Sequence, residues 1–205
     1  MSKSIDSSLF PLSTSRLIKG NRRLLRIKII QILCASQFGE MQWREVFDHI
    51  FYREFIFDSP ESESEKILKP SEVIELESDS KIQWEEEDIR FASRLLYAID
   101  LNKKTLNDYV EAVSENWSVE RISSLDLMIL FLGIIEIVLF KEIPPKATLN
   151  EAIEIAKALS SSKSTTFING ILDFTNTTYD SLIATKKDEY TNPENFILSI
   201  LRSLD

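Results

Sequence analysis

The sequence predicts an all-α fold, and three observations support this. The 205 residues include only 4 Gly and 6 Pro, too few turn formers for a protein of many short strands. Apolar residues recur at helical spacing, between residues that typically start or end helices. No segment shows the alternation of a strand, and no internal repeat is present. The length suffices for one domain, or two small ones, with a hydrophobic core.

Two helices are predicted in the first 57 residues. The first covers residues 22–38 and ends at Gly39, with Leu25, Ile29 and Ile32 on one apolar face. The second covers residues 41–57 and is rich in aromatic residues, whose helical spacing favours core packing over nucleotide stacking. These aromatic residues are Trp43, Phe47, Phe51, Tyr52, Phe55 and Phe57.

The next three helices are predicted on both sides of residue 110. Residues 85–102 form the third helix, and acidic residues 85–88 in its first turn suit the helix dipole. The fourth covers residues 105–116 and is expected to be capped by Thr105, with Asp108 at N3. The fifth covers residues 125–140, capped by Ser123 or Ser124. It is apolar nearly all round, which predicts the central core helix.

Two more helices follow Pro144 and Pro145, which are predicted to end the fifth helix. A capping box over residues 148–151 starts the sixth helix, which ends near Leu159. The seventh covers residues 165–178. Its Gly170 suggests close contact with a neighbouring helix, for example at Gly133 of the fifth. An apolar segment at residues 196–204 predicts a short C-terminal helix.

The longest apolar run, residues 127–135, lies between Asp126 and Glu136. A membrane span needs about 20 apolar residues, so this run predicts a buried helix and no membrane segment. Asp126 lies in the first turn, where it compensates the dipole. Glu136 lies in the most apolar stretch and is therefore expected to have a Lys or Arg partner.

Residues with catalytic or metal-binding chemistry are scarce. Cys34 is the only cysteine and His49 the only histidine, which excludes a disulfide scaffold, a multi-cysteine zinc site and a histidine pair. No phosphate-binding loop or nucleophile motif is present. We therefore expect no enzyme activity, metal or cofactor. The lone thiol, and residues 1–15 without an apolar signal region, predict a cytoplasmic protein.

Charge is distributed unevenly along the chain. The formal net charge is −9 and the pI about 4.8, which taken alone argues against nucleic-acid binding. Residues 58–88, however, contain three basic and twelve acidic residues and thus equal the whole net charge. Residues 1–28 contain seven basic residues and one acidic residue. The acidic average therefore conceals a basic N-terminal end.

Three of these basic residues, Arg22, Arg23 and Arg26, open the first predicted helix. Cations at a helix N-terminus oppose the dipole, at roughly 0.3–1 kcal/mol each. Their placement suggests another use, such as binding an anion. Residues 58–80, rich in Ser and Glu, predict a disordered or loosely helical insertion that acts as a solvated linker.

A long set of residues in the second half forms a recognisable pattern. It consists of Asn116-Trp117, Arg121-Ile122, Leu125-Asp126, Ile129-Leu130, Glu136, Ile143-Pro144-Pro145-Lys146, Asn150-Glu151-Ala152, Ala156-Lys157, Ser164 and Phe167 to Asp173. This pattern resembles the NusB family of bacterial transcription antitermination factors. The arginine-rich start of the first helix, with Gln31 and Leu33, is similar to the family's opening helix.

The resemblance implies a fold of two small helical bundles, and it also implies what the protein binds. It implies binding to the single-stranded boxA element of nascent RNA, together with the ribosomal protein NusE, in the antitermination complex on RNA polymerase at ribosomal RNA operons. Family members occur as monomers and as dimers, so a homodimer is a further expectation. The expected organisation is a flexible basic tail at 1–19, a helical domain at 20–180 with the acidic insertion at 58–83, and an extension at 181–205.

The resemblance also implies the site residues. RNA-binding roles are expected for Lys19, Arg22, Arg23, Arg26, Arg121, Lys163 and Phe167. Asp126 is expected at the partner surface. For Phe167 a core position is an equal alternative, and Asn169 and Gly170 are expected to pack rather than to contact RNA.

Two other functions stay open at this point. The first is an interaction adaptor that kept the fold and lost RNA binding, which the acidic insertion suggests. Besides a solvated linker, that insertion allows two other interpretations: a decoy that competes with RNA for the basic end, or an extra partner site. The second is the RNA-binding module of an RNA methyltransferase, which the absence of a methyl-donor domain makes the weaker alternative.

Overall fold

The computed structural model describes residues 18–39, 41–52, 82–114 and 121–185. The described elements are two short strands and seven helices. They are β1 (Ile18–Lys19), α1 (Arg22–Phe38), α2 (Trp43–Phe51), β2 (Ile82–Gln83), α4 (Glu86–Leu101), α5 (Lys103–Val113), α6 (Ser124–Leu139), α7 (Pro145–Leu159) and α8 (Ser162–Thr185). The acidic insertion at 58–80, most of the N-terminal tail, Phe55, Phe57 and the expected C-terminal helix lie outside the described residues.

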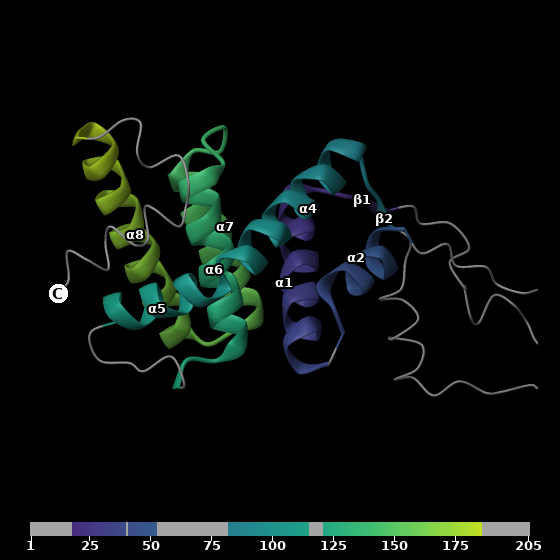
Figure 1. The fold of residues 1–205 in the computed structure, drawn as a ribbon, viewed down its shortest axis with the longest axis horizontal. Helices are drawn as coiled ribbons and strands as arrows, with labels where there is room; N and C mark the ends of the chain where they lie inside the picture. Colours follow the sequence, from purple (N-terminus) through teal and green to yellow (C-terminus); the bar gives the residue numbers. More distant parts are fainter. Residues whose placement is uncertain (1–17, 40, 53–81, 115–120, 186–205) are drawn as a thin grey trace, which may run out of the picture.

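The helices form two groups that meet along α6, which confirms the all-α prediction of two small bundles. Helices α1, α2 and α4 pack together in the first group, and α6, α7 and α8 in the second (Figure 1). Helix α5 joins the second group, where the Tyr109 hydroxyl lies 2.8 Å from Thr175 Oγ1 of α8. Both α1 and α4 pack against α6, so a single core extends through the two groups.

Helix α6 is the centre of this core, as its sequence predicts. Every residue from Asp126 to Val138 is buried. Ser123 caps the helix, because its side chain accepts a hydrogen bond from the Asp126 amide at 3.1 Å. Gly133 allows α8 to approach, since a Cβ there would lie 2.8 Å from the Leu172 side chain.

Two short strands hold the starts of α1 and α4 together. The sequence shows no strand pattern, yet Ile18 pairs with Ile82 in a parallel register. The Gly20 amide extends the pairing by donating to the Gln83 carbonyl at 2.8 Å. A Cβ on Gly20 would lie 2.3 Å from a Trp84 ring atom, so glycine permits this approach. The pairing places the segment that precedes α1 beside the segment that follows the acidic insertion.

Several helix limits differ from those expected. Helix α2 begins at Trp43 rather than at residue 41. Helix α5 begins at Lys103, and Thr105 therefore does not cap it. The side chain of Asn102 donates to the Ala98 carbonyl at 2.8 Å and closes α4, so α5 follows without a loop.

The prolines start a helix instead of ending one. Helix α6 ends at Leu139, and α7 begins at Pro145, because proline suits the first helical position. The expected capping box at residues 148–151 is therefore wrong, and Thr148 lies buried inside α7.

Helix α8 also differs from its prediction. It begins at Ser162, where the Ser161 side chain accepts a hydrogen bond from the Ser164 amide at 3.1 Å. The expected close contact at Gly170 is wrong, since a Cβ there would meet nothing within 4 Å.

Candidate nucleic-acid interface

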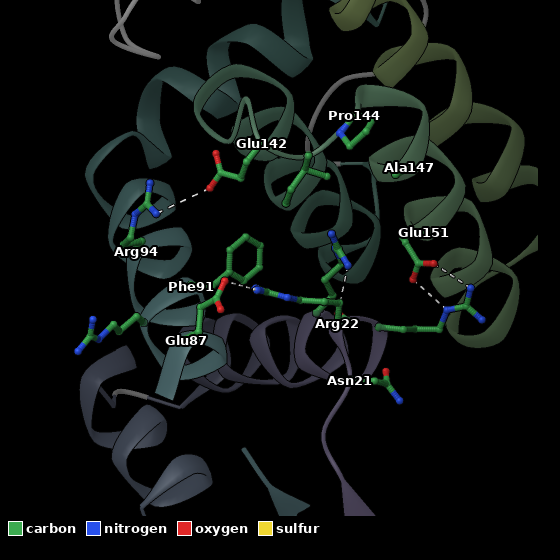
Figure 2. Close-up of a pocket in the computed structure, with 13 residues that line it drawn as sticks. Asn21, Arg22, Glu87, Phe91, Arg94, Glu142, Pro144, Ala147 and Glu151 are labelled. Carbon is green, nitrogen blue, oxygen red and sulfur yellow. Dashed lines mark hydrogen bonds and ion pairs between the residues drawn. The ribbon is translucent and has the colours of Figure 1, made fainter. Parts of the chain in front are cut away.

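A groove of about 880 Å³ opens where α1 begins, between α4 and the connection from α6 to α7 (Figure 2). Its lining is rich in charge. The basic residues are Arg22, Arg23, Arg26, Arg90 and Arg94, and the acidic residues are Glu87, Glu142 and Glu151. The three arginines at the start of the first predicted helix, Arg22, Arg23 and Arg26, therefore all line this groove.

Arg22 is held on one wall of the groove by α4. Its guanidinium lies over the Phe91 ring, 4.6 Å from the centroid. Its NH2 group lies 3.2 Å from Glu87 Oε1, and its Nε lies 3.4 Å from Asp88 Oδ1. The side chain remains 42% exposed. Because a guanidinium has five donors, it can bind a further anion here.

Arg23 faces α7 and is 52% exposed. Its Nε and NH2 each donate to a Glu151 oxygen at 2.9 Å, a bidentate pair. The hydrogen bond from Arg23 lowers the pKa of Glu151, and the same bond raises the pKa of Arg23. Lys19, on β1, is highly exposed, and its Nζ lies 3.9 Å from Glu85 Oε1.

Arg26 points into the protein, unlike the two arginines before it. Its Nε and NH2 donate to the two Glu136 oxygens at 2.7 and 2.9 Å, and the side chain is 5% exposed. Thr148 Oγ1 donates to Glu136 Oε2 at 2.9 Å. The prediction that Glu136 has a basic partner is confirmed. The guanidinium of Arg26 is held in this buried pair and is not exposed to a ligand at the surface.

The remaining predicted site residues lie near the other end of α6. Arg121 precedes α6, and Lys163 and Phe167 lie in the first turns of α8; the two cations are exposed, and Phe167 packs against the core. About 20 Å of helix separates the start of α6 from Glu136, at 1.5 Å per residue. The structure therefore brings Lys19, Arg22 and Arg23 together and places Arg121 and Lys163 apart from them.

Asp126 belongs to this second region but is only 6% exposed. Its Oδ1 accepts a hydrogen bond from Ser160 Oγ at 2.6 Å. The bond ties the start of α6 to the turn between α7 and α8, close to Lys163. Asp126 is therefore buried beneath this turn rather than exposed at the surface.

The α4 side of the groove is not among the sites that the sequence predicts. Arg90 and Arg94 line it, and they are one helical turn apart. Their spacing of four residues places them on one face of a helix, which the sequence could have indicated. No local pattern, however, indicates that α4 begins beside α1. That arrangement depends on the pairing of β1 with β2.

Within the described ranges, no group of three or more His, Cys, Asp or Glu side chains could hold a metal ion. None of the helices in these ranges is long and apolar enough to cross a membrane.

Comparison with protein families gives a match to the NusB family over residues 25–176. Curated relatives agree. The "Transcription antitermination protein NusB" of Natranaerobius thermophilus is 47% identical over 72 residues, which is 35% of this chain and 52% of that protein. The protein of the same description from Clostridium botulinum (strain Kyoto / Type A2) is 38% identical over 111 residues, covering 54% of this chain and 78% of that protein.

A solved structure supports the fold. The T. maritima NusB structure aligns with a TM-score of 0.56 at 24% identity, over 78% of this chain and 93% of that chain. Both chains therefore share the all-helical architecture.

Proposed function

The chain belongs to the NusB family and is a NusB-like transcription antitermination factor, and from this premise we propose that it binds boxA-type single-stranded RNA together with NusE. The observation that supports RNA binding most directly is the exposed arginine pair, Arg22 and Arg23, at the groove where α1 begins. Lys19 adds a third exposed cation beside them. The complex would act on RNA polymerase in the cytoplasm.

The chemistry of this surface suits a flexible, single-stranded nucleic acid. Guanidinium groups bind phosphate through paired N–H donors, and their planes accept unstacked bases. If Lys19, Arg22 and Arg23 each neutralise one phosphate, log K should fall with log salt at a slope of about −2, from −0.7 per phosphate. A protein whose cations do not contact RNA phosphates would not show this dependence of the affinity on salt concentration.

The second region has a supporting role in this proposal. Arg121 and Lys163 supply a further pair of exposed cations near the start of α6. Asp126 would act indirectly, because its bond with Ser160 fixes the turn that leads to Lys163. An RNA that contacts both regions would have to span about 20 Å, the length of α6 between its start and Glu136.

Charge reversal tests the proposal. Binding of a labelled boxA RNA and of a scrambled RNA is measured by fluorescence anisotropy, with and without NusE, for the full chain and for Arg22→Glu/Arg23→Glu. We expect the variant to lose most boxA affinity. The matched control is Arg44→Glu/Lys104→Glu, which makes the same charge change at exposed positions that do not line the groove. Equal affinity of both variants and the unmodified chain would contradict the proposal.

One observation favours a second function, an interaction adaptor that does not bind RNA. In the structure each of the three cations at this surface has a carboxylate partner: Lys19 has Glu85, Arg22 has Glu87 and Asp88, and Arg23 has Glu151. Such pairing would reduce the attraction for RNA. The adaptor is supported if NusE binds in a pull-down while no RNA binding appears at low salt, with or without NusE.

A further inference from the structure

Helix α4 contributes two exposed arginines to the groove, which the RNA contacts proposed above do not include. Arg90 and Arg94 are four residues apart on α4, so they lie on one face. Their side chains are 72% and 63% exposed, and both line the groove together with Arg22. The groove therefore has cations on its α4 wall as well as at the start of α1.

The guanidinium of Arg94 lies at one end of a series of contacts between planar groups. Arg22 lies over Phe91 at 4.6 Å, Phe91 meets Phe140 edge to face with centroids 4.9 Å apart, and Arg94 lies over Phe140 at 4.8 Å. Both rings are buried, Phe91 at 6% and Phe140 at 1% exposure. In Figure 2 the Phe91 ring lies between Arg94 and Arg22. Two exposed guanidiniums thus each contact one ring of the same buried aromatic pair.

This arrangement leaves the N–H edges of Arg94 available to an anion. Stacking uses the face of a guanidinium, and its donors point outward in the plane of the group. The nearest carboxylate, Glu142 Oε1, is 3.9 Å from Arg94 NH1, beyond hydrogen-bond distance. Glu142 and Glu87 are themselves 60% and 86% exposed, so both carboxylates can turn to solvent when a phosphate enters.

We infer that Arg94 binds a phosphate of the same RNA that Arg22 and Arg23 contact. Arg90, which is paired with the exposed Glu86, lies one turn away as a second cation. The inference rests on the proposed function and extends the RNA path from the start of α1 across the groove to α4. The aromatic pair lies between Arg22 and Arg94, which favours an RNA backbone that places one phosphate at each of the two guanidiniums. A pre-organised guanidinium loses less conformational freedom on binding than a mobile one.

The test is the salt dependence of RNA binding by the full chain. The affinity for labelled boxA RNA is measured over a series of KCl concentrations for the unmodified chain, Arg94→Gln and Arg90→Gln/Arg94→Gln. Each lost phosphate contact should make the negative slope of log K against log salt shallower by about 0.7. It should also lower the affinity about fivefold at 0.1 M salt. Arg94→Lys should keep the slope but bind more weakly, because it keeps the charge and loses the fork.

Arg44→Gln is the matched control. Arg44 is also an exposed arginine over an aromatic ring, 4.6 Å from Trp43, but it belongs to α2 and does not line the groove. Its substitution should leave the slope unchanged. If Arg94→Gln keeps the full slope, or changes it no more than Arg44→Gln does, the inference is overturned.

The outcome separates this inference from the proposed function. If Arg22→Glu/Arg23→Glu abolishes binding while Arg94→Gln binds like the unmodified chain, RNA binding stands and the α4 contact does not. If no variant binds RNA differently from the unmodified chain, both fail. Thermal unfolding of each variant checks that a change in binding does not reflect a change in folding.

Discussion

Arg23 and Arg26 are three residues apart on α1, and each makes a bidentate pair with a glutamate more than 100 residues away. The pair of Arg23 with Glu151 lies on the surface, and that of Arg26 with Glu136 lies in the core. Hydrogen-bond distances in the two pairs are nearly equal. Burial is the main difference between the two pairs. It assigns the inner pair to folding and leaves the outer arginine open to a ligand.

The largest expected effect comes from breaking the inner pair. Arg26→Ala would leave the fully buried Glu136 without its cation, which should lower the free energy of unfolding by ~3–5 kcal/mol. Denaturation in urea measures this loss. Arg26→Met/Glu136→Gln should recover much of it, because neither side chain then leaves an uncompensated charge. A loss below ~1 kcal/mol for Arg26→Ala would show that the comparison of the two pairs is wrong.

The third member of the inner network has the next largest effect. Thr148 donates to Glu136 at 2.9 Å and is 1% exposed. Thr148→Val keeps the shape and removes the hydroxyl, so the free energy of unfolding should fall by about 1.5–3 kcal/mol, as for a hydrogen bond to a charged group. Thr166→Val, at an exposed position on α8, is the control and should change little. Equal losses in both variants would argue against a specific role for the Thr148 hydroxyl.

The inner pair also shows how far the sequence predicts the structure. The limits of α1, the central position of α6 and the need of Glu136 for a basic partner all followed from local patterns. An ionised carboxylate in an apolar helix requires a cation, whatever the fold. Which arginine supplies it did not follow, because Arg26 is 110 positions away in the chain and looked equivalent to Arg22 and Arg23.

The predictions that the structure contradicts also failed because contacts between distant parts of the chain are not visible in a local pattern. Thr148 to Glu151 has the residue types of a capping box, but Pro145 starts the helix earlier and the Thr148 hydroxyl goes to Glu136. The α4 wall of the groove was missed because β1 and β2 are two residues each, too short for a strand pattern. Local signals predicted elements, while the groove depends on contacts between distant segments.

The outer pair should respond in the opposite way to the inner one. Arg23→Gln should leave the unfolding midpoint close to that of the unmodified chain, because exposed ion pairs contribute little to stability. Its boxA affinity should fall about fivefold at 0.1 M salt, as expected for one phosphate contact. Denaturation and RNA anisotropy on the same preparation check both parts. A stability loss as large as that of Arg26→Ala would remove the distinction between the two pairs.

The smallest effect concerns Glu151, which competes with RNA for Arg23. Glu151→Gln should raise boxA affinity, because the Arg23 donors are no longer held by a carboxylate. Its effect on stability depends on pH. Since Arg23 lowers the pKa of Glu151 from 4.5, the pair stabilises the fold above about pH 4.5, and this contribution is lost as pH falls through the folded-state pKa.

The unmodified chain and Glu151→Gln should therefore differ slightly in unfolding free energy at neutral pH and converge in acid. Denaturation at a series of pH values between about 7 and 3 measures the convergence. Glu154→Gln is the matched control on the same helix, because its carboxylate is hydrogen-bonded to Lys157 and Arg23 acts on it only through its charge. It should show a similar pH trend without the gain in RNA affinity. A gain of equal size in both variants would indicate that net charge, and not the release of Arg23, governs the binding.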